Sequence, residues 1–320
     1  MRLVILTLLW AVACAPESPS TGQSSAALAS RELSAAPWLD LAPLVKVLPA
    51  GKEEPGSGPT RVDVGADGRV IVAAPLDEAL LVIDPADKSV RRQAFPGVPR
   101  SVDARADGTI VVLDAHTRSG VLIPPPSSGA GAPITLVTPA DRGRWSALRF
   151  GPDGGVLVET IGARTQPYVE GGAASGPLRG LPLPARGRQA FAVRADDVTA
   201  EVRVSPWGLP LADDGALPEG EHVHTWRWRT TLHLGAVHVV GEQRDGSLVV
   251  VTEELTSRQP LRVQRAAWTL TPDGDVERWA ELPPPTDVPV GKEWALLPDG
   301  TLLLLRVDDS GARLLAWRKR

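Results

Sequence analysis

The chain has 320 residues, of which 43% are hydrophobic and 22% charged, with a formal net charge of −4. A mildly acidic chain with scattered arginines lacks the clustered positive charge of a nucleic-acid surface, so no nucleic acid is expected among its partners. The single cysteine, Cys14, excludes an internal disulfide, so the stability of the folded part must come from packing.

The first residues have the features of an export signal. Arg2 is followed by an apolar run, Leu3 to Trp10, that is too short to span a bilayer as a helix. The sequence AVAC then resembles the lipobox of bacterial lipoproteins, in which the cysteine is acylated and becomes the first residue. We expect residues 1–13 to be a lipoprotein signal peptide and Cys14 to bear acyl chains such as palmitate. An ordinary secretory signal with a chance cysteine is the alternative.

Residues 14–40 are rich in Ser, Ala and Pro and show little hydrophobic periodicity. This composition predicts a flexible tether, because it offers too little apolar surface for a core. Through the acylated cysteine, the tether would hold the remaining domain, residues 41–320, at a membrane of the bacterial envelope. That domain would lie in the periplasm or at the cell surface.

One short motif recurs along residues 41–320: an Asp-Gly pair followed by a short run of β-branched residues or leucines. It occurs with gaps of 40, 46, 92 and 54 residues, at Asp67-Gly68, Asp107-Gly108, Asp153-Gly154, Asp245-Gly246 and Asp299-Gly300. The gap of 92 is two periods, and a degenerate copy, RADDVTAEVRV, falls inside it at residues 194–204. We therefore expect six repeated units.

Each unit has the pattern of a four-stranded antiparallel blade. A strand leads into the Asp-Gly hairpin, whose glycine accepts a positive φ, and a strand such as RVIVAA or TIVVLD follows. A third strand and a second turn then lead to an outer strand, as in ALLVIDP and ADKSVRRQAF of the first unit. Because no amphipathic helix stands out, the pattern predicts an all-β, six-bladed β-propeller; five or seven blades are the alternatives.

The last unit ends after its third strand, whereas the segment APLVKVLPAG at residues 42–51 has the pattern of an outer strand and precedes the first unit. We expect this N-terminal strand to complete the last blade, because the blade would otherwise carry an exposed edge. The closed ring is expected to be a monomer.

Units such as SVDARADGTIVVLDAHTRSGVLI resemble the NHL-repeat and gluconolactonase-like group of six-bladed propellers. The likeness covers the first two units well, the third, fifth and sixth less well, and the fourth poorly. It implies blade architecture without an activity, because propellers include enzymes, binding modules and scaffolds. The gluconolactonase-like enzymes hold a divalent metal with a Glu, two Asn and an Asp; this chain contains no Asn, so that site cannot be carried over.

Asp63 and Asp103 each lie four residues before the turn aspartate of their unit, so they take equivalent places on neighbouring blades. Two carboxylates converging on a central channel would raise one another's pKa and could bind a divalent cation or perform acid–base work. The remaining units carry Arg149, Ala192, Gly241 and Ala295 at this place. Because no ring of ligands results, we favour carboxylates that are solvated or bonded to backbone, and no cofactor.

His222 and His224 form a His-x-His pair, which is a recognised half of a zinc or copper site. Trp226 and Trp228 continue the same face of a strand, so a packed stripe of rings is the expectation that we favour over a metal site.

The other tryptophans are expected to play two roles. Five fall inside predicted strands, where they would fill space between blades: Trp145, Trp268, Trp279, Trp294 and Trp317. Trp207 lies in the long loop at residues 205–220 and is the candidate for a binding surface. Packing of its ring on its own blade is the alternative.

No Ser-His-Asp order, phosphate-binding loop, dinucleotide-binding glycine pattern or glycosidase carboxylate pair stands out in the sequence. We therefore expect a membrane-anchored lipoprotein whose propeller is a non-catalytic binding or scaffold module for an envelope protein or polymer. The alternative is a channel-centred enzyme acting on a small metabolite, either a lactonase-like hydrolase or a quinone-dependent sugar dehydrogenase.

Overall fold

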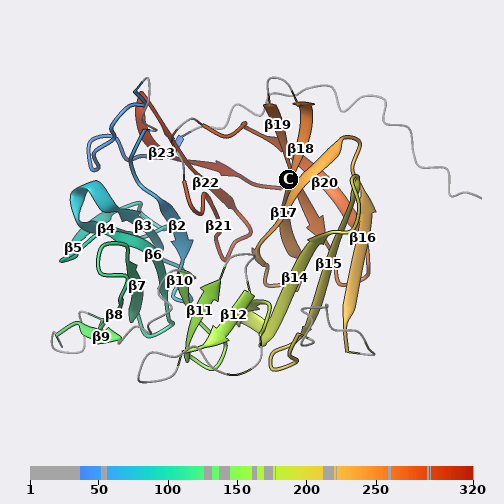
Figure 1. Cartoon of the computed structure of the whole chain (residues 1–320), viewed down its shortest axis with the longest axis horizontal. Helices are drawn as coiled ribbons and strands as arrows, with labels where there is room; N and C mark the ends of the chain where they lie inside the picture. The colour runs from blue at the N-terminus through green and yellow to red at the C-terminus, as the bar shows by residue number, and fades with distance from the viewer. Residues whose placement is uncertain are drawn as a thin grey trace, which may run out of the picture. The chain divides into compact units, whose positions relative to one another are not determined.

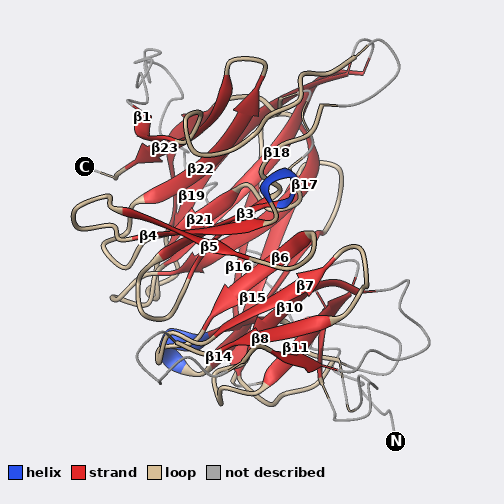
Figure 2. Ribbon diagram, turned by 90° about the vertical axis from the view of Figure 1, so that its left-hand side faces the viewer, coloured by secondary structure: helices blue, strands red, loops and turns tan. Residues whose placement is uncertain are grey.

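The computed structural model describes residues 37–51, 56–125, 132–136, 145–160, 164–168, 176, 178–211, 220, 222–258, 261–286, 288 and 290–319. The chain divides after Ser34, and the unit that follows, Ala35–Arg320, contains all of these residues. In this part of the chain the helical structure consists of short 3-10 turns, at Pro75–Asp77 and Pro184–Arg186, amid strands (Figure 2). None of these residues belongs to a helix that is long and apolar enough to cross a membrane.

Six antiparallel sheets follow one another along the chain as the blades of a β-propeller (Figure 1). Blade 1 consists of β2 (Arg61–Val64), β3 (Val70–Ala74), β4 (Ala79–Ile83) and β5 (Val90–Ala94). Blade 2 consists of β6 (Pro99–Ala104), β7 (Ile110–Asp114), β8 (Gly120–Ile123) and β9 (Ile134–Leu136). Blade 3 consists of β10 (Trp145–Phe150), β11 (Val156–Thr160) and β12 (Arg164–Pro167). Blade 4 consists of β13 (Leu181–Leu183), β14 (Arg188–Arg194), β15 (Thr199–Pro206) and β16 (His224–Arg229). Blade 5 consists of β17 (His233–Glu242), β18 (Leu248–Arg258), β19 (Leu261–Leu270) and β20 (Val276–Leu282). Blade 6 consists of β21 (Trp294–Leu296), β22 (Leu302–Asp308), β23 (Gly311–Trp317) and β1 (Pro37–Asp40). The predicted six-bladed propeller is confirmed.

The third blade is the one with three strands. Beyond these three strands, the described residues add an antiparallel bridge between Thr165 of β12 and Arg179, in which each residue's N–H donates to the other's carbonyl oxygen.

The Asp-Gly repeat forms the hairpin between the first two strands of five blades. In the first blade the N–H of Gly68 donates to the carbonyl oxygen of Gly65 at 2.8 Å, and Oδ1 of Asp67 accepts the N–H of Arg69 at 3.0 Å. Gly68 has a φ of +83°, and the equivalent glycines of the other four hairpins lie between +78° and +92°. The repeated phrase is therefore fixed by backbone geometry, because a side chain is strained at these angles.

In the fourth blade the repeated motif lies in a different hairpin from the one predicted. The degenerate copy at residues 194–204 contains the hairpin between the second and third strands, whereas the first hairpin turns at Pro184–Arg186. The prediction was therefore wrong by one strand, and Ala192 lies on β14 rather than on the first strand. The degenerate copy was mistaken for the first hairpin because Oδ1 of Asp196 accepts the N–H of Val198 at 2.8 Å, which is the same hydrogen bond that stabilises the Asp-Gly turns.

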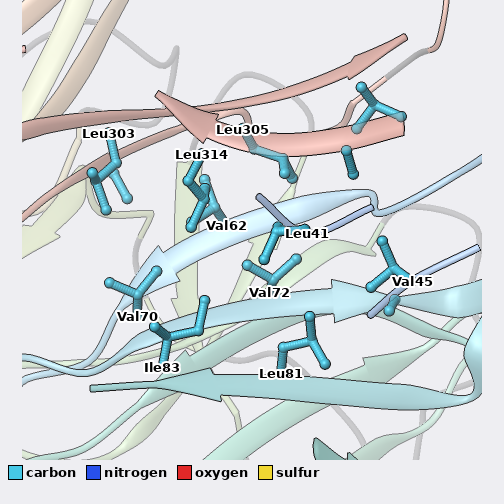
Figure 3. Packing of buried hydrophobic residues seen from close by; sticks show 14 of the residues in the cluster. Leu41, Val45, Val62, Val70, Val72, Leu81, Ile83, Leu303, Leu305 and Leu314 are labelled. Carbon is cyan, nitrogen blue, oxygen red and sulfur yellow. The ribbon is translucent and has the colours of Figure 1, made fainter. Parts of the chain in front are cut away.

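Apolar clusters between neighbouring blades hold the ring together. Five such clusters join blades 6 and 1, 1 and 2, 2 and 3, 4 and 5, and 5 and 6. In the first of them, Val62 and Leu81 of the first blade meet Leu305 and Leu314 of the sixth (Figure 3). The described residues contribute no such cluster between blades 3 and 4.

The predicted strand tryptophans lie in strands of the third, fifth and sixth blades, within these clusters or packed against them. Trp145, Trp294 and Trp317 are buried, and the rings of Trp228 and Trp268 meet across blades 4 and 5 with their centroids 5.7 Å apart. These contacts confirm that the tryptophans fill space between blades.

Two connections close the ring between its last and first blades. On the outside, β1 pairs with β23, so an N-terminal strand completes the last blade as predicted. That strand is Pro37–Asp40, however, whereas residues 42–51 form a turn and an isolated bridge, so the predicted location was wrong. The strand ends early because Oδ1 of Asp40 accepts the N–H of Ala42 at 3.0 Å and starts a turn. On the inside, the N–H of Val62 donates to the carbonyl oxygen of Lys292 at 2.9 Å.

Candidate functional site

Six ionisable side chains from four blades meet at the centre of the ring. They are Arg61 and Asp63 of β2, Asp103 of β6, Arg149 of β10, Glu159 of β11, and Lys292, which precedes β21. We call them the central cluster. Their convergence marks the ring axis, because residues of blades 1, 3 and 6 can meet only where the first strands approach it.

Asp63 binds three cations of this cluster. Its Oδ1 lies 2.6 Å from Nζ of Lys292, and its Oδ2 lies 3.5 Å from Nη2 of Arg61 and 3.6 Å from Nη1 of Arg149. Asp63 is 6% exposed, so these charges interact in surroundings that screen them little. The carboxylate therefore links the first blade to the third and sixth.

Asp103 is bound chiefly by backbone. Its Oδ1 accepts the N–H of Ala104 at 2.8 Å, and its Oδ2 accepts the N–H of Phe150 in the neighbouring blade at 2.7 Å. In the third blade, Arg149 pairs with Glu159 through its Nε. The cluster thus contains three cations and three carboxyl groups, and its formal charges cancel when all six groups are ionised.

Burial and charge separate the protonation behaviour of the two aspartates. Burial and the negative charge of Asp63 raise the pKa of Asp103 to about 6. Burial acts in the same direction on Asp63, but the three surrounding cations outweigh it and hold the pKa of Asp63 below its usual value. Burial lowers the pKa of Lys292 to about 8, although the charge of Asp63 opposes this. One carboxylate stays ionised while its neighbour changes its protonation near neutral pH.

The sequence predicted part of this arrangement. Asp63 and Asp103 do occupy equivalent places, opposite Ile71 and Val111 on the second strands of their blades, and the charge of Asp63 does raise the pKa of Asp103. The backbone bonds of Asp103 agree with the interpretation that we favoured from the sequence. Asp63 differs from it, because this carboxylate is buried and ion-paired and its three cations lower its pKa, which was expected to be raised.

The other members of the central cluster were not predicted from the sequence. Arg149 was placed at the correct position, but it was used only as an argument that the blades do not form a ring of metal ligands. A cation at that position could have been recognised as the counter-ion of Asp63. Glu159 and Arg61 could have been suspected from charges within apolar strands. Lys292 gave no local signal, because its partner Asp63 lies 229 residues away along the chain.

A divalent cation would have to compete with protein cations at this place. The ammonium of Lys292 already lies on Asp63, and the described residues hold no group of three or more His, Cys, Asp or Glu side chains arranged for a metal ion. A divalent-cation site at Asp63 and Asp103 therefore stays an untested prediction, in which the ion would have to displace or coexist with protein cations.

The two histidines of the His-x-His pair differ in setting. His224 begins β16, and its ring lies 4.1 Å from that of Trp226, whereas His222 lies in the turn before the strand. Along β16 the side chains of Trp226 and Trp228 are buried, while Arg227 is exposed. The ring stripe is thus formed by His224 and the two tryptophans, without His222; a metal role for the pair stays untested.

Trp207 lies directly after β15 and is half-buried. The guanidinium of Arg179 stacks on its ring at 5.2 Å, and a Cβ at Gly151 of the third blade would lie 3.3 Å from Cζ2 of the indole. The ring therefore contacts the third blade, and the role of Trp207 in a binding surface stays a prediction.

No known protein family and no curated protein matches the sequence. Solved structures do match the fold. The aldose sugar dehydrogenase of Streptomyces coelicolor, in its PQQ-bound form, has 13% identity and a TM-score of 0.45, and the match covers 85% of this chain and 96% of that one. Virginiamycin B lyase of Staphylococcus aureus has 11% identity and a TM-score of 0.42, with 85% and 98% covered. A chain of a mitotic checkpoint complex has 12% identity and a TM-score of 0.46, with 98% and 99% covered. The chain is similar to these proteins in fold alone.

Proposed function

We propose that the chain is a membrane-anchored lipoprotein of the bacterial envelope whose propeller acts as a non-catalytic binding or scaffold module. The anchor is proposed from the sequence AVAC, whose cysteine, Cys14, lies outside the described residues. Acyl chains on that cysteine would attach the protein stably, because two or more chains hold a protein at a bilayer far better than one. The partner is an envelope protein or polymer.

One observation carries the binding role: the charges of the central cluster are bound to one another and to backbone. Asp63 is paired with Lys292, Arg149 with Glu159, and Asp103 with two backbone N–H groups. Groups held in this way stabilise the ring between blades, and such a ring presents its loops and blade edges for recognition.

The test is cross-linking of the full-length chain in intact envelope, followed by solubilisation and purification of the adducts. We expect a discrete, saturable adduct with an envelope component. Trp207→Ala should reduce its yield, whereas Leu261→Ala, which changes an exposed side chain of the fifth blade, should not. Absence of any saturable adduct would contradict the binding role.

A second candidate function is favoured by the protonation of the cluster. A carboxyl group with a pKa of about 6 and an amine with a pKa of about 8, in Asp103 and Lys292, suit a general acid and base at neutral pH. The chain would then be a channel-centred enzyme, either a lactonase-like hydrolase or a quinone-dependent sugar dehydrogenase. Turnover of a lactone, or quinone-dependent oxidation of an aldose, that is lost in Asp103→Asn would support it; no turnover in either assay would leave the binding role.

A further inference from the structure

The hairpin of β18 and β19 in the fifth blade projects beyond its counterparts in other blades. β18 ends at Arg258, 12 residues after the turn glycine Gly246, whereas the second strands of blades 1, 2, 3 and 6 end six to eight residues after theirs. At about 3.3 Å per residue, the end of β18 lies about 13 to 20 Å further from its Asp-Gly turn. We call residues 255–258 and 261–263 the arm.

The arm has an apolar side that ends on an uncovered leucine. Leu255 and Val263 lie opposite each other on the two strands and are half-buried. Leu261 shares the face of Val263, because side chains two residues apart in a strand point the same way. It is 67% exposed, more than any other large apolar side chain in the described part of the chain.

The arm is also positively charged. Arg262 is exposed on the side of β19 opposite to Leu261, and Arg258 adds a second positive charge. No Asp or Glu occurs between Glu254, which is itself buried, and Asp273. An exposed apolar side chain next to arginines suits the surface of an anionic bilayer, because the apolar group enters the interfacial region while the cations bind lipid phosphates.

The proposed anchor brings such a surface within reach of the arm. A flexible chain as long as the 23 residues 14–36 spans about 25 Å on average. A lipid anchor at Cys14 would thus hold the propeller close to the bilayer, and this tethering allows a weak contact to form. We propose that the arm docks on an anionic phospholipid surface, with Leu261 in the interfacial region and Arg262 on lipid phosphates.

The inference rests on the proposed membrane-anchored function and deepens it, because a docked arm gives the tethered propeller a fixed orientation on the bilayer. The lipid contact is separate from the contact with the envelope partner. Leu261→Ala is therefore still expected to leave the cross-linked envelope adduct unchanged.

The test reports on the surroundings of the arm itself. Thr256, an exposed residue of the arm, is changed to Cys in the full-length Cys14→Ser chain and labelled with the polarity-sensitive fluorophore NBD. The probe is vesicles of phosphatidylcholine and phosphatidylglycerol in equal amounts, and the control is vesicles of phosphatidylcholine alone. We expect a saturable blue shift of the emission with the anionic vesicles, which added sodium chloride weakens, and none with the neutral vesicles.

The matched control is Thr225→Cys, which places the same label on an exposed threonine of β16 in the fourth blade and should show no shift. Arg262→Ala should weaken vesicle binding at the Thr256 label about fivefold, the contribution of one arginine near an anionic surface, whereas Arg262→Lys keeps the charge and should bind normally. Leu261→Ala should also weaken binding, because it removes the inserted apolar group.

Three results would overturn the inference: a Thr256 label that no vesicle shifts, a shift of equal size with neutral vesicles, and a shift of equal size at Thr225. The labelled chain has no acylated cysteine and no added partner. A failed palmitate labelling or a failed envelope cross-link therefore leaves this titration unaffected, so the two proposals fail separately.

Discussion

The ammonium of Lys292 lies 2.6 Å from Oδ1 of Asp63 and joins the sixth blade to the first at the centre of the ring. The backbone of the same residue accepts a hydrogen bond from Val62 at 2.9 Å, so side chain and main chain close the ring at one point. This inner closure complements the pairing of β1 with β23 on the outside of the sixth blade.

Removal of this ammonium should destabilise the protein. Lys292→Met keeps the aliphatic stem but leaves Asp63 with only its two longer ion pairs, so we expect the free energy of unfolding to fall by about 3 kcal/mol. The control is Lys319→Met, because Lys319 pairs with Glu277 at the same 2.6 Å but at the surface. That change should cost less than about 1 kcal/mol. Equal losses in urea unfolding of the two variants would contradict the buried role of Lys292.

The pH dependence of stability should carry the signature of Asp103. Its pKa of about 6 in the folded state lies above the ordinary value of 3.8, so the folded state binds its proton more tightly. The stability that this proton contributes is present at low pH and is lost as the pH rises through about 6. We expect the free energy of unfolding of the wild type, relative to Asp103→Asn, to decrease between about pH 4 and pH 6, the range between the ordinary and the raised pKa of this carboxyl. A constant difference between the two proteins over this range would show that the carboxyl titrates normally.

Deletion of the closing strand should open the last blade. Removing residues 37–41 takes away β1 and Leu41, which is fully buried in the cluster between blades 6 and 1. The edge of β23 would be exposed, so we expect a marked fall in melting temperature and a tendency to aggregate. Deletion of residues 17–34 should leave the melting temperature unchanged, because that segment was predicted as a tether without a core. Equal melting of both truncated chains would contradict the closure.

Calcium and magnesium should not stabilise the protein. The ammonium of Lys292 and the guanidinium of Arg149 already neutralise Asp63, and two carboxylates cannot supply the six or more oxygens that calcium prefers. A site that bound either ion would add about 2.7 kcal/mol of stability at a hundredfold excess over its Kd. A rise in melting temperature with metal that is lost in the Asp63→Ala, Asp103→Ala double variant would establish a cation site and favour the hydrolase.

The sequence predicted those parts of the ring that local chemistry determines. The Asp-Gly hairpins could be found because Asp67 and Gly68 satisfy the turn by themselves, and the number of blades follows from their spacing. The same logic failed in the fourth blade, where Asp196 makes an identical local bond in a different hairpin.

Features that depend on distant contacts could not be predicted in the same way. The closing strand at Pro37–Asp40 is short and is selected by its pairing with β23, which the pattern of residues 42–51 obscured. In the central cluster, the aspartates were found from their equivalent places, but Lys292 and Glu159 join them only because the ring brings the blades together. Ion pairs between distant residues leave no periodic signal.

Metabolic labelling with palmitate decides whether the propeller is anchored as proposed. In a bacterial host, the wild-type chain should incorporate the label and fractionate with membranes, because Cys14 would become the acylated first residue of the mature protein. Cys14→Ser should carry no label and should accumulate as the unprocessed precursor. An unlabelled wild-type chain, or a Cys14→Ser chain that is cleaved normally and released in soluble form, would contradict the lipoprotein assignment.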